Sequence, residues 1–130
     1  MTTTGPEGSA PQKPPRKTGF SHLIAAATYS VAGLRRLLRE SAFRQELTLG
    51  LLILIGLAAW GLSPGRIIGF AILLLILVMV EALNTAIEVL VDHLSPGWSE
   101  FARDAKDLGS LAVGATLCAM GLYLGWALFL

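Results

Sequence analysis

Apolar residues recur along this chain in four stretches, and their spacing is typical of helices. Between Phe20 and Leu38 they are three or four residues apart, which predicts an amphipathic helix over residues 20–39. Arginines follow at its end, so we expect this helix to lie at a membrane surface, in the plane of the lipid headgroups. A helix packed on its neighbours, as in a soluble protein, is the alternative.

Three longer apolar runs follow the first stretch. They comprise residues 47–62, which can begin earlier near Ser41, then 67–91 and 108–130. About 20 apolar residues span the roughly 30 Å of bilayer hydrocarbon. The sequence therefore predicts an all-α membrane protein, with a surface helix followed by transmembrane helices at about 42–62, 66–91 and 107–130. Residues 1–18, rich in Pro, Gly, Thr and Lys, are expected to be a disordered tail.

Composition supports a membrane protein and indicates its orientation. Of the 130 residues, 54% are apolar, and the mean hydropathy is +0.65. The net charge of +1 does not suggest nucleic-acid binding, and the single cysteine excludes a disulfide framework. Seven of the ten Lys and Arg residues precede residue 45, so the N-terminus is expected in the cytoplasm. The turn at 63–66 and the C-terminus then face outward, and the polar, partly helical segment 92–107 faces the cytoplasm.

The second transmembrane run carries polar residues at regular spacing. They follow the pattern i, i+3, i+4, i+7 and i+11, which places them on one face of a helix: Glu81, Asn84, Thr85, Glu88 and Asp92. Carboxylates inside a bilayer are costly and mark a functional site by default. The predicted topology brings further charged residues to the same cytoplasmic level, namely Glu40 and Glu46 before the first span and Lys106 and Asp107 before the third.

This combination indicates a site for Mg²⁺ and a polyphosphate. Mg²⁺ commonly binds one or two carboxylates together with substrate phosphates. Lys106 could neutralise phosphate charge, and an acid free of metal could act as a general base. Two alternatives remain open: a polar network that joins helices, and a proton or cation relay in a small ion- or proton-coupled transporter. No Walker A motif and no protein-kinase glycine-rich loop occurs in the sequence.

Several segments resemble one known family. They are E81-A-L-N-T-A-I-E88, V91-D92 and A105-K-D107, together with the stretch from Gly19 to Leu34, S41-A-F-R-Q-E46 and D107-L-G-S-L-A-V113. These segments are similar to the bacterial (prokaryotic) diacylglycerol kinase family of small integral membrane kinases, which also includes undecaprenol kinases. The resemblance covers residues 19–130, which would form the membrane kinase domain.

The resemblance implies an ATP- and Mg²⁺-dependent lipid kinase of the bacterial inner membrane. Such an enzyme phosphorylates diacylglycerol to phosphatidic acid at the cytoplasmic face; phosphorylation of undecaprenol is the alternative. It also implies a homotrimer with active sites shared between subunits.

Site residues follow from the same resemblance. Glu81 matches the catalytic base, and Glu40 and Glu88 match metal ligands. The expected ATP-binding residues are Tyr29, Glu40, Asn84, Glu88, Asp92, Lys106 and Asp107. Those expected near the lipid substrate are Ala26, Ser30, Phe43, Arg44, Gln45, Trp60 and Glu81.

Overall fold

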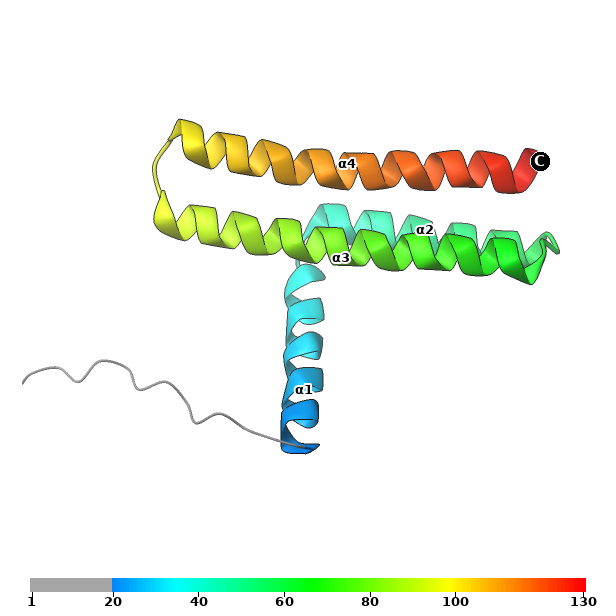
Figure 1. The fold of residues 1–130 in the computed structure, drawn as a ribbon, viewed down its shortest axis with the longest axis horizontal. Helices are drawn as coiled ribbons and strands as arrows, with labels where there is room; N and C mark the ends of the chain where they lie inside the picture. Colours follow the sequence, from blue (N-terminus) through cyan, green and yellow to red (C-terminus); the bar gives the residue numbers. More distant parts are fainter. Residues whose placement is uncertain (1–19) are drawn as a thin grey trace, which may run out of the picture. The chain divides into compact units, whose positions relative to one another are not determined.

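A computed structural model of the chain describes residues 20–130, and all regular structure in that range is helical (Figure 1). The predicted tail, residues 1–18, lies outside the described residues. The chain divides into two units between Val31 and Ala32, inside helix α1 (Phe20–Leu37). In the first unit, Ser30 Oγ donates a hydrogen bond of 3.0 Å to the carbonyl of Ala26, four residues earlier in the helix.

Helix α1 ends two residues before its predicted end at residue 39. Large apolar side chains along it are exposed, including Ile24, Tyr29 and Val31. This agrees with a helix whose apolar surface is covered by lipid, although its position at the membrane surface stays a prediction.

The second unit contains three long helices after the end of α1: α2 (Ser41–Ala59), α3 (Pro64–Leu94) and α4 (Glu100–Phe129). Helix α3 packs along α4 and also contacts α2, and these consecutive helices run antiparallel (Figure 1). All three helices are long and apolar enough to cross a membrane. Together with the helical content, this confirms the predicted all-α membrane fold of one helix followed by three candidate spans.

The turn between α2 and α3 ends α2 three residues earlier than the predicted span. Gly61 has a φ of +79°, a conformation that glycine adopts without a steric penalty. The N–H of Gly61 donates to Ala58 O at 3.1 Å, and the N–H of Leu62 donates to Leu57 O at 3.2 Å. These two bonds form a Schellman motif, which satisfies the last carbonyls of α2.

The connection between α3 and α4 is shorter than the sequence suggested. Only residues 95–99 of the expected segment 92–107 are outside helices, because α3 continues to Leu94 and α4 begins at Glu100. Ser99 caps α4 by accepting a hydrogen bond of 3.2 Å from the N–H of Ala102. With 31 residues, α3 is about 46 Å long at 1.5 Å per residue, which exceeds the hydrocarbon thickness of roughly 30 Å. The polar end of α3 can therefore extend into the membrane interface.

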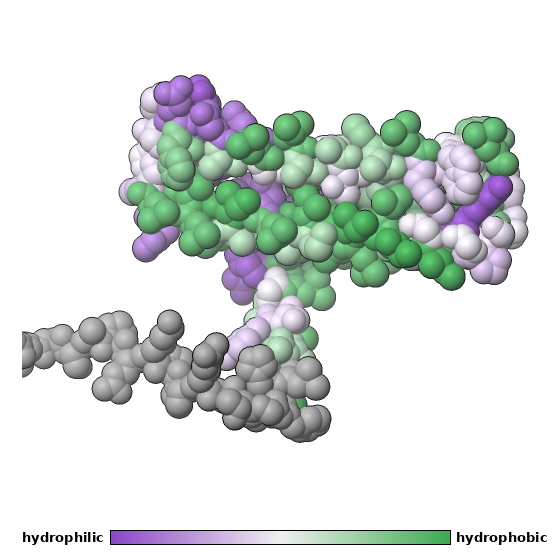
Figure 2. Space-filling model, in the orientation of Figure 1, coloured by the Kyte–Doolittle hydropathy of each residue, from purple (hydrophilic) through white to green (hydrophobic). Residues whose placement is uncertain are grey.

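The buried core lies where the three helices meet. It comprises Leu57, Phe70, Leu74, Leu77, Val113 and Met120. Most other large apolar side chains point outward, so the visible surface of the helices is mainly hydrophobic (Figure 2). Hydrophilic side chains gather over the first turns of α4 in the same view. A surface of this kind is suited to lipid rather than water along most of the bundle.

Candidate active site

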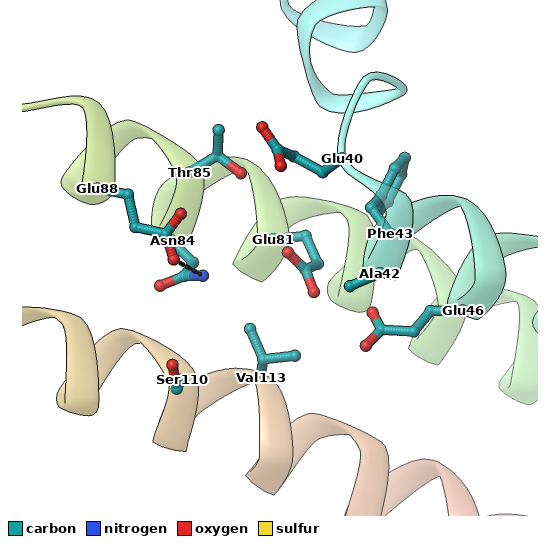
Figure 3. Close-up of a pocket in the computed structure, with 10 residues that line it drawn as sticks. All are labelled: Glu40, Ala42, Phe43, Glu46, Glu81, Asn84, Thr85, Glu88, Ser110 and Val113. Atoms are coloured by element: carbon teal, nitrogen blue, oxygen red, sulfur yellow. Dashed lines mark hydrogen bonds between the residues drawn. The ribbon is translucent and has the colours of Figure 1, made fainter.

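A cavity of about 320 Å³ lies among the three long helices, and four glutamates line it. Glu40 comes from the residue before α2, Glu46 from α2, and Glu81 and Glu88 from α3 (Figure 3). The remaining lining residues are Ala42, Phe43, Asn84, Thr85, Ser110 and Val113. We call this space the acidic cavity. No Lys, Arg or His side chain lines it among the described residues.

The helical spacing of α3 explains why its polar residues share the cavity. Glu81, Thr85 and Glu88 recur at intervals of four and three, so they lie on the face of α3 that is turned toward α2 and α4. Glu81 is 7% exposed and Thr85 is 8% exposed, so both are buried. Figure 3 shows the carboxyl groups of Glu46 and Glu81 pointing toward one another from α2 and α3. A buried carboxylate of this kind needs a partner to offset its desolvation.

Two arginines position Glu40 at the junction between α1 and α2. Arg36 forms an ion pair with the Glu40 carboxylate. Arg44 Nη1 donates to the carbonyls of Arg39 at 2.9 Å and Leu38 at 3.2 Å, which holds the turn that precedes α2. The Glu40 backbone is extended and its side chain makes no helix-capping bond, so the carboxylate can face the cavity.

The acidic cavity contains buried oxygen atoms that lack hydrogen-bond partners. Asn84 Nδ2 donates to Glu88 Oε1 at 3.2 Å, but Asn84 Oδ1 accepts no bond. Glu46 Oε2 is likewise buried without a partner. Leaving such an acceptor unpaired costs roughly 1–3 kcal/mol, which a bound cation or donor would relieve.

Carboxylate and amide oxygens are the donors that Mg²⁺ prefers, so the residues of the acidic cavity fit this ion. Within residues 20–130, no three His, Cys, Asp or Glu side chains are grouped closely enough to hold a metal by themselves. Because Mg²⁺ usually takes one or two carboxylates and completes its shell with phosphates and water, the cavity suits an ion that arrives with a nucleotide.

The predicted ATP-binding residues of the second unit are only partly brought together. Asn84, Glu40 and Glu88 line the acidic cavity. Lys106 does not; its Nζ is 2.5 Å from Asp92 Oδ1, in an ion pair that joins the end of α3 to the start of α4. Asp107 is exposed. Tyr29 lies in the first unit, on the exposed surface of α1.

The residues expected near the lipid are distributed more widely. Phe43 is fully buried and lines the acidic cavity. Arg44 and Gln45 line a separate groove on the outside of α2, which continues along Thr48, Leu49 and Leu52. Trp60, 82% exposed, follows the last residue of α2, at the opposite end of that helix from Glu40. Ala26 and Ser30 belong to the first unit, and their proposed roles stay predictions.

Five lining residues received no role from the sequence, and three of them are polar: Glu46, Thr85 and Ser110. Glu46 had a signal, because it ends the segment S41-A-F-R-Q-E46 and lies at the entry to the first span. Thr85 belongs to the polar stripe of α3. Ser110 had none apart from its place in the segment that follows Asp107.

Comparison with known proteins gives one consistent result. Residues 28–129 match the family model described as prokaryotic diacylglycerol kinase. A diacylglycerol kinase from a Sinorhizobium species is 44% identical over 108 residues, which cover 83% of this chain and 79% of that relative. The diacylglycerol kinase of Haemophilus influenzae is 34% identical over 115 residues, covering 88% and 98%. That of Escherichia coli K12 is 39% identical over 99 residues, covering 74% and 80%. The matched range includes every residue that lines the acidic cavity.

Proposed function

The chain belongs to the prokaryotic diacylglycerol kinase family, and we propose that it transfers the γ-phosphoryl group of ATP to diacylglycerol and so produces phosphatidic acid. Membership of this family confirms the prediction of a membrane lipid kinase. The observation that carries the proposal is the acidic cavity, where four glutamates from the start of α2 and from the C-terminal half of α3 meet. The relatives that match are named diacylglycerol kinases, which favours diacylglycerol over undecaprenol as the acceptor.

Metal binding is assigned to two of the four cavity glutamates, one from the start of α2 and one from α3. Glu40 and Glu88 would hold Mg²⁺, and the Asn84 amide orients the Glu88 carboxylate through its hydrogen bond. When bound with ATP, Mg²⁺ neutralises charge on the phosphates during transfer. The Arg36–Glu40 ion pair keeps the Glu40 carboxylate in place until the nucleotide arrives.

Glu81 is the proposed general base. It is the buried carboxylate of the stripe, and it lies deeper along α3 than Glu88. Glu81 accepts the proton of the lipid hydroxyl while the hydroxyl oxygen bonds to the γ-phosphorus and the bond from that phosphorus to the bridging oxygen of ADP breaks. Phosphoryl transfer requires mainly positioning and charge stabilisation, so a compact helical site without a nucleotide-binding fold suffices.

The acceptor is tested with purified protein in lipid bilayers. Mg-ATP is supplied with diacylglycerol or undecaprenol in parallel, and phosphate in the lipid fraction is measured. We expect phosphatidic acid from diacylglycerol and little product from undecaprenol. The reverse preference would establish the undecaprenol alternative. Ion or proton flux without phosphorylated lipid would instead identify a transporter.

We propose that the N-terminus and residues 95–99 face the cytoplasm, as ATP access requires. The support is the concentration of basic residues before α2, against the single Arg66 at the turn between α2 and α3. Thiol labelling at Ser63→Cys and Ser99→Cys, in a Cys118→Ala background, tests this orientation in intact cells. Labelling is expected at position 63 from outside. Labelling of position 99 from outside would contradict the proposed site, because ATP could not reach it.

We also propose a homotrimer in which neighbouring chains share each site. Four carboxylates line the acidic cavity, whereas Lys106 of the same chain is paired with Asp92 outside it. A phosphate site needs a cation, which a second copy of the chain could supply. Mixing the inactive variants Glu81→Gln and Lys106→Ala after subunit exchange should restore some activity. Exchange without restored activity would mean that one chain supplies both residues.

A further inference from the structure

We infer that Gly109 is a positioning residue for nucleotide binding: without a side chain there, Asn84 can lie against α4 and hold Glu88 toward the acidic cavity. This inference rests on the proposed function and adds a residue on α4 to the site. Gly109 is not among the residues that line the acidic cavity. It acts through the Asn84 amide, which is hydrogen-bonded to Glu88.

The first observation is steric. A Cβ built on Gly109 would collide with Asn84 Oδ1 and would lie 3.1 Å from Asn84 Cγ. Other glycines of α4 are different, since a Cβ on Gly114, Gly121 or Gly125 would meet nothing within 4 Å. Among these glycines of α4, the requirement for glycine is therefore specific to position 109, which faces Asn84.

The second observation concerns the hydrogen bonds of Asn84. One end of its amide donates to Glu88 Oε1 at 3.2 Å, and the other end, Oδ1, is buried against Gly109 with no partner. The orientation of the amide therefore depends on its bond to Glu88 and on the space at Gly109. A methyl group at position 109 would fill that space.

Two movements could relieve the collision, and both affect nucleotide binding. If the Asn84 amide rotates, its bond to Glu88 is lost. If α4 moves away from α3, the ion pair between Lys106 Nζ and Asp92 Oδ1, now 2.5 Å apart, is lengthened, because Lys106 lies only three residues before Gly109. Neither movement acts first on Glu81, the proposed base. The expected defect is therefore in the affinity for Mg-nucleotide.

The test uses the full chain in bilayers and measures the binding of a fluorescent trinitrophenyl ATP analogue with Mg²⁺. Gly109→Ala should weaken binding about tenfold, the loss expected from one hydrogen bond to a charged group. The KM for Mg-ATP should rise with it, while kcat and the KM for diacylglycerol remain close to wild type. Gly114→Ala is the matched control, because it adds the same methyl group to the same helix without a neighbour. It should bind like wild type.

A double-mutant cycle with Asn84→Ala separates this role from a general packing defect. Once Asn84 is shortened, the methyl group at position 109 has nothing to displace, so Gly109→Ala should cause little further loss of binding. Independent effects that simply add would contradict the inference. If Gly109→Ala alone fails to fold, folding restored in the double variant supports the inference, and a double variant that still fails overturns it.

Two further outcomes would overturn the inference. One is equal binding by Gly109→Ala and Gly114→Ala. The other is a Gly109→Ala preparation in which a smaller fraction of the protein is active, while the affinity for the ATP analogue and the KM for Mg-ATP are unchanged. Failure of the proposed function is distinguishable from both. A wild-type protein that bound the analogue but phosphorylated no lipid would contradict the lipid kinase alone, because the binding comparison needs no acceptor.

Discussion

Two regions of the α3–α4 pair differ in how completely their polar groups are hydrogen-bonded. At the end away from the acidic cavity, Arg66 Nη1 donates to the carbonyl of Ala127 at 2.7 Å, and the Tyr123 hydroxyl donates to the carbonyl of Arg66 at 2.9 Å. The Arg66 guanidinium also lies 5.4 Å from the centre of a Trp126 ring, in a cation–π contact. Gly69 leaves room for the Tyr123 hydroxyl. This end, which we call the arginine clamp, is complete without a ligand.

In the acidic cavity, by contrast, some buried polar groups have no hydrogen-bond partner. Of its four glutamates only Glu40 has a basic partner among the described residues, Arg36. Glu46 Oε2 and Asn84 Oδ1 are buried without partners. Unpaired buried acceptors reduce stability, so a fold selected for stability alone would be expected to satisfy them. The difference indicates that the arginine clamp holds the helices together, while the acidic cavity keeps its oxygen atoms available for a ligand.

The largest effect is expected from Glu81→Gln. The amide keeps the shape of the side chain but cannot accept the hydroxyl proton, so kcat should fall by roughly 10²–10⁴-fold. Nucleotide affinity and the free energy of unfolding should change little. Turnover in bilayers, binding of the ATP analogue and unfolding in detergent measure the three quantities. Near-normal turnover would remove Glu81 from the role of base and would weaken the contrast between the acidic cavity and the arginine clamp.

A smaller effect is expected when either proposed metal ligand is removed. Glu88→Ala and Glu40→Ala should each weaken the use of Mg-ATP by at least roughly 10- to 100-fold, the loss typical when a residue that only supports a metal ligand is removed. Excess Mg²⁺ should partly restore the rate, because the lost quantity is metal affinity. A Mg²⁺ titration of each variant makes the measurement. A variant with a normal titration curve would exclude that residue as a ligand and leave the other unaffected.

The smallest effect on activity is expected at the arginine clamp. Tyr123→Phe removes one hydrogen bond to Arg66 O and should lower the free energy of unfolding by about 0.5–1.5 kcal/mol. Turnover should remain close to wild type, because the clamp lies far from the acidic cavity along α3. Unfolding in detergent and turnover in bilayers provide the comparison. A large loss of turnover at unchanged stability would show that the clamp has a role in the reaction.

The helices and the acids of α3 could be predicted from the sequence, because both depend on spacing within one helix. Apolar runs gave three spans, and the intervals between Glu81, Asn84 and Glu88 gave one polar face. Helix ends were less accurate. The sequence predicted the third span from residue 107, whereas α4 begins at Glu100. The Ser99 side chain caps the helix there, and hydropathy does not detect such a cap.

Contacts between helices could not be predicted to the same degree. The pairing of Lys106 with Asp92 and the approach of Glu46 to Glu81 depend on how far each helix is rotated and shifted against the next. The role of Gly109 depends on a distance between helices, which no periodicity encodes. Arg44 donates to the carbonyls of Leu38 and Arg39, a local contact that no periodicity encodes either, and its expected lipid contact stays a prediction.

The most direct test of the central claim is to locate the bound metal–nucleotide complex. Mn²⁺ can replace Mg²⁺ with ATP in an isotope-labelled sample of the full chain, and its paramagnetism broadens the NMR signals of nearby residues. We predict strong broadening of Asn84 and Glu88 and much weaker broadening of Arg66, since 18 residues of helix separate Arg66 from Asn84 by about 27 Å. Broadening centred on the arginine clamp, or none at the acidic cavity when ATP is saturating, would contradict the account.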